Sequence, residues 1–218
     1  MSPEEAAQFF RTHPQFFDQH PELLESIYVP HPYGGRAIPL SERQILSLRD
    51  KVKALEAKLG ELLAFGEAND AISEKVHRLA VGLVAARDFA AVAQALQFHL
   101  REDFSVPHVA LRVWGWTAPA GAPEGAPVDE ALRAQVEAMG APLCGPAAGA
   151  GGAFLAWFGD AAGHVRSLAL VPLGQTTAAG LLALGSEDAQ RFYAEMGTLY
   201  LRRIGELTAA ALAAHLRG

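Results

Sequence analysis

The apolar positions in the first half of the chain predict one long amphipathic helix over residues 41–86. Apolar residues recur there every three or four positions, the spacing of one face of an α-helix. The first stretch alternates these two spacings strictly and consists of Ile45, Leu48, Val52, Leu55, Leu59 and Leu62. The alternation slips at Phe65 and then resumes. The second stretch consists of Asn69, Ile72, Val76, Leu79 and Leu83. Two heptad stretches joined by a three-residue slip are typical of a coiled coil.

A helix of this length, about 65–70 Å, would expose its apolar stripe if it stood alone. We therefore expect the stripe to form the seam of a homodimer. The alternative is a helix that folds back on its own domain. Asn69 falls on the seam, where a buried amide often fixes the register, but it also fits a point where the helix meets a globular domain. The seven basic and seven acidic residues between 41 and 80 indicate a solvated face and not a DNA-binding region.

Short helices are predicted before the long one. Residues 2–5, Ser-Pro-Glu-Glu, form a capping box with proline at the first helical position, so a helix should run to about Arg11. The segment HPQFFDQHPELL, residues 13–24, contains two His-Pro pairs, and proline favours the first turn of a new helix. We interpret His13 and His20 as neighbours of helix starts. A metal site or a contact with a partner is the alternative, although the histidines lack metal-ligand spacing.

After residue 86 the pattern becomes that of a mixed α+β domain. Asp88 caps a helix predicted to reach Glu102, and Ser186 is predicted to cap a final helix over residues 187–215. A further helix is predicted over residues 128–139. Strands are predicted over residues 107–116, 166–173 and 178–185, loops over 117–127 and 140–152, and either a strand or a helix over 153–158. The chain is thereby divided into a helical segment 1–40, a dimerisation helix 41–86 and a domain 87–218.

Composition narrows the functional classes. Half of the 218 residues are hydrophobic, and the net charge of −6 argues against a binder of nucleic acid or of an anionic membrane. The single cysteine, Cys144, excludes an intrachain disulfide and fits a reducing compartment. The N-terminus lacks the basic and apolar regions of a signal peptide, and the uncharged stretches are broken by Gly, Pro or polar residues. We therefore expect a cytoplasmic protein.

Two sets of motifs carry a family resemblance. Residues 166–207, RSLALVPLGQTTAAGLLALGSEDAQRFYAEMGTLYLRRIGEL, resemble the C-terminal half of a GAF domain. Together with HPQFFDQHPELL, LSERQILSLRDKVKALE, ANDAISEKVH and LCG, they resemble the DUF484 family of bacterial proteins, whose function is unknown. The resemblance implies a GAF-like α+β fold with a central antiparallel sheet. GAF domains are sensory or ligand-binding modules and are often dimeric through flanking helices. The region between Trp116 and Ala153 is shorter than this resemblance implies.

The resemblance also implies a ligand pocket on the sheet face away from the helix pair. The residues expected to line it are Arg112, Trp114, Cys144, Phe154, Trp157 and Ser167. Arg112 is the lone charge in an apolar strand and is a candidate anchor for an anionic ligand. The alternative is that it lies at a strand edge and meets a surface carboxylate.

Catalytic signals are weak. Some GAF-fold proteins reduce methionine sulfoxide with a pocket cysteine, but the sulfenic acid so formed needs a second thiol, and this chain has only Cys144. We expect Cys144 to be a small packed hydrophobe. The glycine-rich residues 149–154 do not follow a convincing strand, which argues against a phosphate-binding loop. The sequence therefore predicts a non-enzymatic, homodimeric sensory or regulatory module without metal or cofactor, which binds a small molecule or a protein partner. A dimeric scaffold with a self-filled pocket and a Cys144-dependent redox enzyme remain as alternatives.

Overall fold

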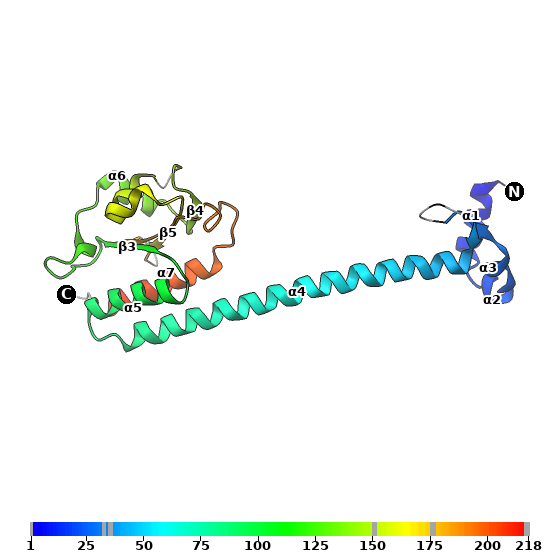
Figure 1. Ribbon diagram of the computed structural model, residues 1–218, viewed down its shortest axis with the longest axis horizontal. Helices are drawn as coiled ribbons and strands as arrows, with labels where there is room; N and C mark the ends of the chain where they lie inside the picture. The colour runs from blue at the N-terminus through cyan, green and yellow to red at the C-terminus, as the bar shows by residue number, and fades with distance from the viewer. Residues whose placement is uncertain (1, 32–33, 35–36, 150–151, 175–177, 216–218) are drawn as a thin grey trace. The chain divides into compact units, whose positions relative to one another are not determined.

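The computed structural model describes residues 2–31, 34, 37–149, 152–174 and 178–215 (Figure 1). By its internal contacts the chain divides into two compact units, Met1–Glu67 and Ala68–Gly218. We call them the N-terminal unit and the C-terminal unit and describe each by itself. The sequence-based division of the chain at residues 40 and 86, into a helical segment, a dimerisation helix and a domain, stays a prediction.

The N-terminal unit contains three short helices and a two-stranded sheet. They are α1 (Pro3–Thr12), α2 (Phe16–Gln19), α3 (Glu22–Ser26), and β1 (Tyr28–Val29) paired antiparallel with β2 (Ile38–Pro39). The predicted capping box is confirmed, because Ser2 Oγ accepts a hydrogen bond from the Glu5 amide at 3.1 Å and the Glu5 carboxylate accepts one from the Ser2 amide at 2.7 Å. Each His-Pro pair separates two helices, and the His13 and His20 carbonyls accept bonds from amides of the helix that follows.

The long helix α4 (Leu40–Ala85) is one unbroken helix of 46 residues. Its bounds lie within one residue of those predicted from the apolar spacing. It begins in the N-terminal unit and ends in the C-terminal unit.

The C-terminal unit is built on a four-stranded antiparallel sheet. Its strands are β3 (His108–Val113), β4 (Leu143–Pro146), β5 (Ser167–Leu173) and β6 (Gly180–Ser186), in the order β3-β6-β5-β4. The two central strands, β5 and β6, are buried almost throughout because both faces of the sheet are covered. The predicted α+β class with a central antiparallel sheet is confirmed.

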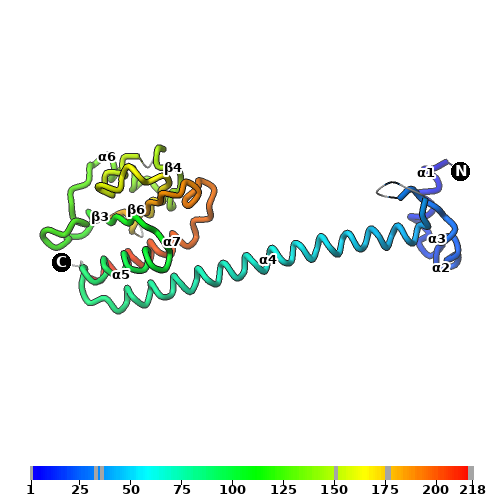
Figure 2. Tube along the Cα trace, in the orientation of Figure 1, coloured from blue at the N-terminus to red at the C-terminus, as the bar shows by residue number. Residues whose placement is uncertain are grey.

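Each of the two faces of this sheet packs against a layer of apolar side chains. One face, which we call the helix face, packs against α5 (Phe89–Glu102) and α7 (Leu199–His215), and the end of α4 lies along these two helices (Figures 1 and 2). The other face, which we call the outer face, is covered by α6 (Glu130–Glu137) and the 3₁₀ segment η2 (Gly152–Gly163). Leu79, Leu182 and Leu212 are fully buried on the helix face, and Phe154 and Leu181 on the outer face.

Three details differ from the predicted elements. The final helix begins at Leu199 and not at residue 187, because Ser186 and Asp188 accept hydrogen bonds from nearby amides and close turns there instead. Residues 143–146, predicted as loop, form the edge strand β4, where glycine and proline are tolerated. The ambiguous residues 153–158 belong to η2.

Candidate functional site

The first apolar stretch of α4 is exposed along its whole length. The exposed fractions are 50% for Ile45, 59% for Leu48, 51% for Val52, 69% for Leu55, 57% for Leu59 and 58% for Leu62. We call these six side chains the α4 seam. Leu63 and Phe65 beside it are also more than half exposed. A continuous row of large exposed apolar side chains on one helix has the composition that is typical of association surfaces.

The second apolar stretch of α4 packs into the core of its own chain. Val76, Leu79 and Leu83 are buried in the core between α4, α5, α7 and the helix face of the sheet. The prediction that the apolar stripe forms an intermolecular seam is therefore wrong for this second stretch. Here the alternative applies, in which the helix packs on its own domain. The reason is that the same 3-4 spacing serves either a second chain or the chain's own domain.

Asn69 lies near the start of the C-terminal unit, where α4 meets α7. Its backbone carbonyl accepts a hydrogen bond from the Tyr200 hydroxyl at 3.1 Å, and that hydroxyl also lies 3.0 Å from Ser73 Oγ. The Asn69 side chain is exposed. Its membership of the seam stays a prediction.

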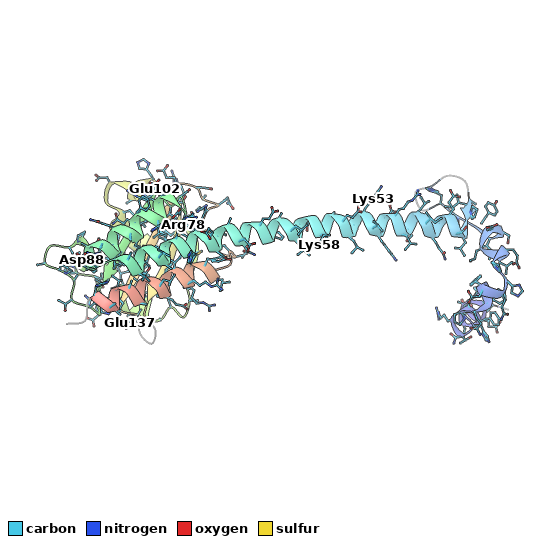
Figure 3. The ribbon with its side chains drawn as sticks, turned by 90° about the horizontal axis from the view of Figure 1, so that it is seen from below. Lys53, Lys58, Arg78, Asp88, Glu102 and Glu137 are labelled. Carbon is cyan, nitrogen blue, oxygen red and sulfur yellow. The ribbon has the colours of Figure 1, made fainter. Side chains whose placement is uncertain are left out.

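A charged cluster joins α4 to the end of α5. The Arg78 guanidinium donates two hydrogen bonds to Asp103 Oδ1, at 3.1 and 2.8 Å, and His99 Nδ1 lies 2.6 Å from Asp103 Oδ2. Hydrogen bonds from His99 and then from Arg78 lower the pKa of the Asp103 carboxyl below its ordinary value. Figure 3 labels Arg78 on the part of α4 that lies alongside α5 and α7. Gly82 permits this approach, since a Cβ there would lie 2.6 Å from His99 Nε2.

The six predicted pocket residues do not come together. Arg112, Trp114, Phe154 and Trp157 lie on the outer face or its covering. Cys144 and Ser167 lie on the helix face, because Cys144 pairs with Ala169 and the side chains of residues 167 and 169 share one face of β5. The predicted pocket composition is therefore wrong for these two residues.

On the outer face, Arg112 packs against aromatic side chains. Its guanidinium lies 5.4 Å from the centre of the Trp157 ring, and Nη1 donates a hydrogen bond to the Leu111 carbonyl at 2.8 Å. Phe154 meets Trp157 edge to face at 5.2 Å, and Trp114 Nε1 donates to the Ala178 carbonyl at 3.1 Å. Burial lowers the pKa of Arg112, which Glu124 partly offsets. Within the described ranges, Arg112 forms no ion pair with a carboxylate, although it lies on the edge strand β3.

On the helix face, Ser167 and Cys144 have structural surroundings. Ser167 Oγ donates a hydrogen bond to the Asp188 carbonyl at 2.6 Å and accepts one from the Phe192 amide at 3.3 Å, which fixes the turn after β6. Cys144 is buried, and this burial raises the pKa of its thiol to about 11. The thiol is therefore protonated at neutral pH, whereas the thiolate is the reactive form.

A cavity that the sequence did not indicate lies between α4, α5 and the segment that leads into α7. Its volume is about 290 Å³. Its lining includes the buried residues Leu100, Leu184 and Ile204 and two cationic residues, Lys75 and Arg191. We call it the helix-face cavity. Its lining residues come from distant parts of the chain, so no local spacing marks it.

Other candidate chemistry has little support in the described ranges. No group of three or more His, Cys, Asp and Glu side chains there is arranged to hold a metal ion. Of the glycine-rich residues 149–154, residues 150 and 151 lie outside the described residues. Not one helix in the described ranges combines the length and the apolar composition needed to span a bilayer.

Comparison with known proteins places the chain beside a family, a relative and a solved structure. The family described as "Protein of unknown function, DUF484" matches residues 1–216. The "Uncharacterized protein YigA" of Salmonella typhimurium is 26% identical over 204 residues, which cover 90% of this chain and 84% of the relative. Among solved structures, the crystal structure of the A. Aeolicus nlh2 GAF domain in an inactive state matches with a TM-score of 0.48 and 16% identity, covering 67% of this chain and 98% of that one.

Proposed function

Because the chain belongs to the DUF484 family, whose function is unknown, we propose its role from its own surfaces. It is a non-enzymatic regulatory module that forms a homodimer through the α4 seam. Its C-terminal unit binds a small molecule or a protein partner.

The observation that carries this proposal is the exposed seam. Burying a Leu, Ile or Val side chain fully contributes about 1.5–3 kcal/mol. Six side chains that are half or more exposed, on each of two chains, therefore offer on the order of 10–20 kcal/mol. Association costs about 4–15 kcal/mol, so this burial is large enough to support a stable pair.

The charges beside the seam favour a parallel pair. With Val52 and Leu55 at the core positions a and d of a heptad, Lys51 and Glu56 take the flanking positions g and e. In a parallel dimer, position g of one helix faces position e of the next heptad on the other helix, which brings Lys51 opposite Glu56 of the second copy. An antiparallel pair would instead place g residues, including Lys51 and Lys58, opposite one another.

The state of Cys144 supports a non-enzymatic role over redox catalysis. A buried, protonated thiol is a weak nucleophile, and the raised pKa keeps it protonated. A second candidate function, a dimeric scaffold without a ligand, is favoured by one observation: Phe154 and Trp157 occupy the outer face where the ligand pocket was expected.

The dimer is tested by placing a charge in the seam. Leu59→Lys puts two like charges into the seam of a pair, whereas Ala57→Lys adds the same charge two residues away, at the outermost heptad position. Light scattering after size-exclusion chromatography should show a dimer for the parent and for Ala57→Lys, and a monomer for Leu59→Lys. A parent that elutes as a folded monomer contradicts the proposal.

The orientation is tested by cross-linking in a Cys144→Ser background. Leu55→Cys places a thiol at a core position that meets its own copy only in a parallel, in-register pair, where a disulfide can form. We expect oxidation to link Leu55→Cys efficiently and to leave Ala57→Cys unlinked. Dimers that form without this selectivity would contradict the parallel arrangement while leaving self-association intact.

A further inference from the structure

The helix-face cavity has an apolar interior. Leu100, Leu184 and Ile204 in its lining are at most 2% exposed, and Phe192 is 3% exposed. Its volume of about 290 Å³ lies at the lower limit of small-molecule pockets, which measure about 300–1,000 Å³. An occupant of matching size has roughly ten heavy atoms in all, at about 30 Å³ for each.

Two cations converge on Phe104 at this cavity. Lys75 Nζ lies 6.0 Å from the centre of the Phe104 ring, and Arg191 Nη2 donates a hydrogen bond to the Phe104 carbonyl. The Arg191 guanidinium also lies 6.0 Å from the Phe192 ring. An arginine has five N–H donors and a lysine ammonium has three, so most of these donors remain available to a ligand.

Neither cation is neutralised by a carboxylate in the part of the chain that the structure describes. Lys75 and Arg191 form no ion pair there. The carboxylate next to Phe104 in the chain, Asp103, is already held by Arg78 and His99. An apolar cavity with two unpaired cations in its lining is complementary to a ligand that has an apolar body and one anionic group.

We propose that the helix-face cavity binds a small amphiphile with an anionic headgroup, of the class of medium-chain carboxylates. The apolar chain lies against Leu100, Leu184 and Ile204, and the carboxylate is bound by Lys75 and Arg191. This inference rests on the proposed role as a binding module and names the chemical class of its small molecule. It places the ligand on the face of the sheet opposite to that expected from the sequence.

The test uses the full-length chain with octanoate and with 1-octanol, which has the same chain length and no charge. We expect calorimetric titration to show saturable binding of one octanoate per chain, and binding of octanol about tenfold weaker or weaker still. Lys75→Gln and Arg191→Gln should each weaken octanoate binding about tenfold and leave octanol binding unchanged. The matched control is Arg101→Gln, because Arg101 also donates to a backbone carbonyl, that of Pro107 at 3.3 Å, but does not line the cavity.

Three results would overturn the inference: octanoate uptake that does not saturate, octanol binding as tight as octanoate binding, or octanoate binding unchanged in both cavity variants. If Arg191→Gln does not fold, Arg191→Lys, which keeps the charge, should retain octanoate binding, and Lys75→Gln still decides the outcome. The mass of each sample is measured in parallel. A dimer that fails to bind octanoate refutes the cavity inference and leaves self-association standing, whereas a monomer that binds it refutes only the dimer.

Discussion

Two leucines of α4, twenty residues apart, allow the two uses of this helix to be separated. Leu79 is completely buried in the core of the C-terminal unit, and Leu59 is 57% exposed on the seam. The substitution Leu→Ala has the same small effect on helix propensity at both positions, since leucine and alanine are both good helix formers. Any large difference between the two variants therefore reports what each side chain contacts.

The expected magnitudes follow from burial. Leu79→Ala leaves a cavity in a packed core and should lower the free energy of unfolding by about 2–5 kcal/mol. For a unit of this size, about 3 kcal/mol corresponds to a fall in Tm of about 6–12 °C. Leu59→Ala should leave the stability of the C-terminal unit unchanged. It removes about 2.4 kcal/mol of transfer free energy per fully buried side chain. Because Leu59 is 57% exposed before association, the loss amounts to about 1.4 kcal/mol for each chain. For the two chains of a dimer together this is about 2.8 kcal/mol, or about a hundredfold in the Kd of the dimer.

Tryptophan fluorescence during urea unfolding measures the first effect, because Trp114, Trp116 and Trp157 all belong to the C-terminal unit. Sedimentation at several concentrations measures the second. The reasoning is refuted if Leu79→Ala unfolds at the same urea concentration as the parent, or if Leu59→Ala destabilises the C-terminal unit as strongly as Leu79→Ala does.

Three further predictions concern the C-terminal unit. The lowered pKa of Asp103 stabilises the fold above the ordinary aspartate pKa of about 3.9, and this stability is lost as the pH falls through the lower folded-state value. Urea midpoints between pH 2 and 6 should therefore depend less on pH in Asp103→Asn, and an unchanged profile would contradict the assignment. Gly82→Ala should destabilise the unit by forcing His99 away. Gly60→Ala, whose Cβ meets no atom within 4 Å, should instead stabilise α4 by about 1 kcal/mol. Equal effects of the two substitutions in thermal melts would count against the close approach of Gly82 to His99. Cys144 should react slowly with Ellman's reagent at pH 8 in the folded protein and rapidly in urea, and rapid labelling of the folded protein would show that the thiol is neither buried nor protonated.

The local features of this fold could be predicted from the sequence. The bounds of α4 follow from its apolar spacing, and the caps at Ser2 and Asp88 follow from side chains that bond to amides three residues away. Each depends on neighbours within one or two helical turns. The strand β4 was missed because its short, Gly- and Pro-containing sequence becomes a strand only by pairing with β5.

The candidate sites depended on information that local sequence lacks. The strands β5 and β6 are apolar on both faces, so their alternation does not say which side chains face the helices, and Cys144 and Ser167 were assigned to the wrong side. The spacing of α4 likewise could not separate the exposed seam from the stretch that contains Leu79, since both have the same period. The helix-face cavity brings Lys75 and Arg191 together across more than a hundred residues, which only the tertiary structure does.

Self-association through the seam is the central claim, and the mass of the intact chain in solution tests it most directly. Native mass spectrometry of the full-length protein should give a species of twice the 23.2 kDa chain mass, and the Leu59→Lys variant should give the chain mass itself. A folded parent protein that stays at 23.2 kDa over the whole accessible concentration range would contradict the account.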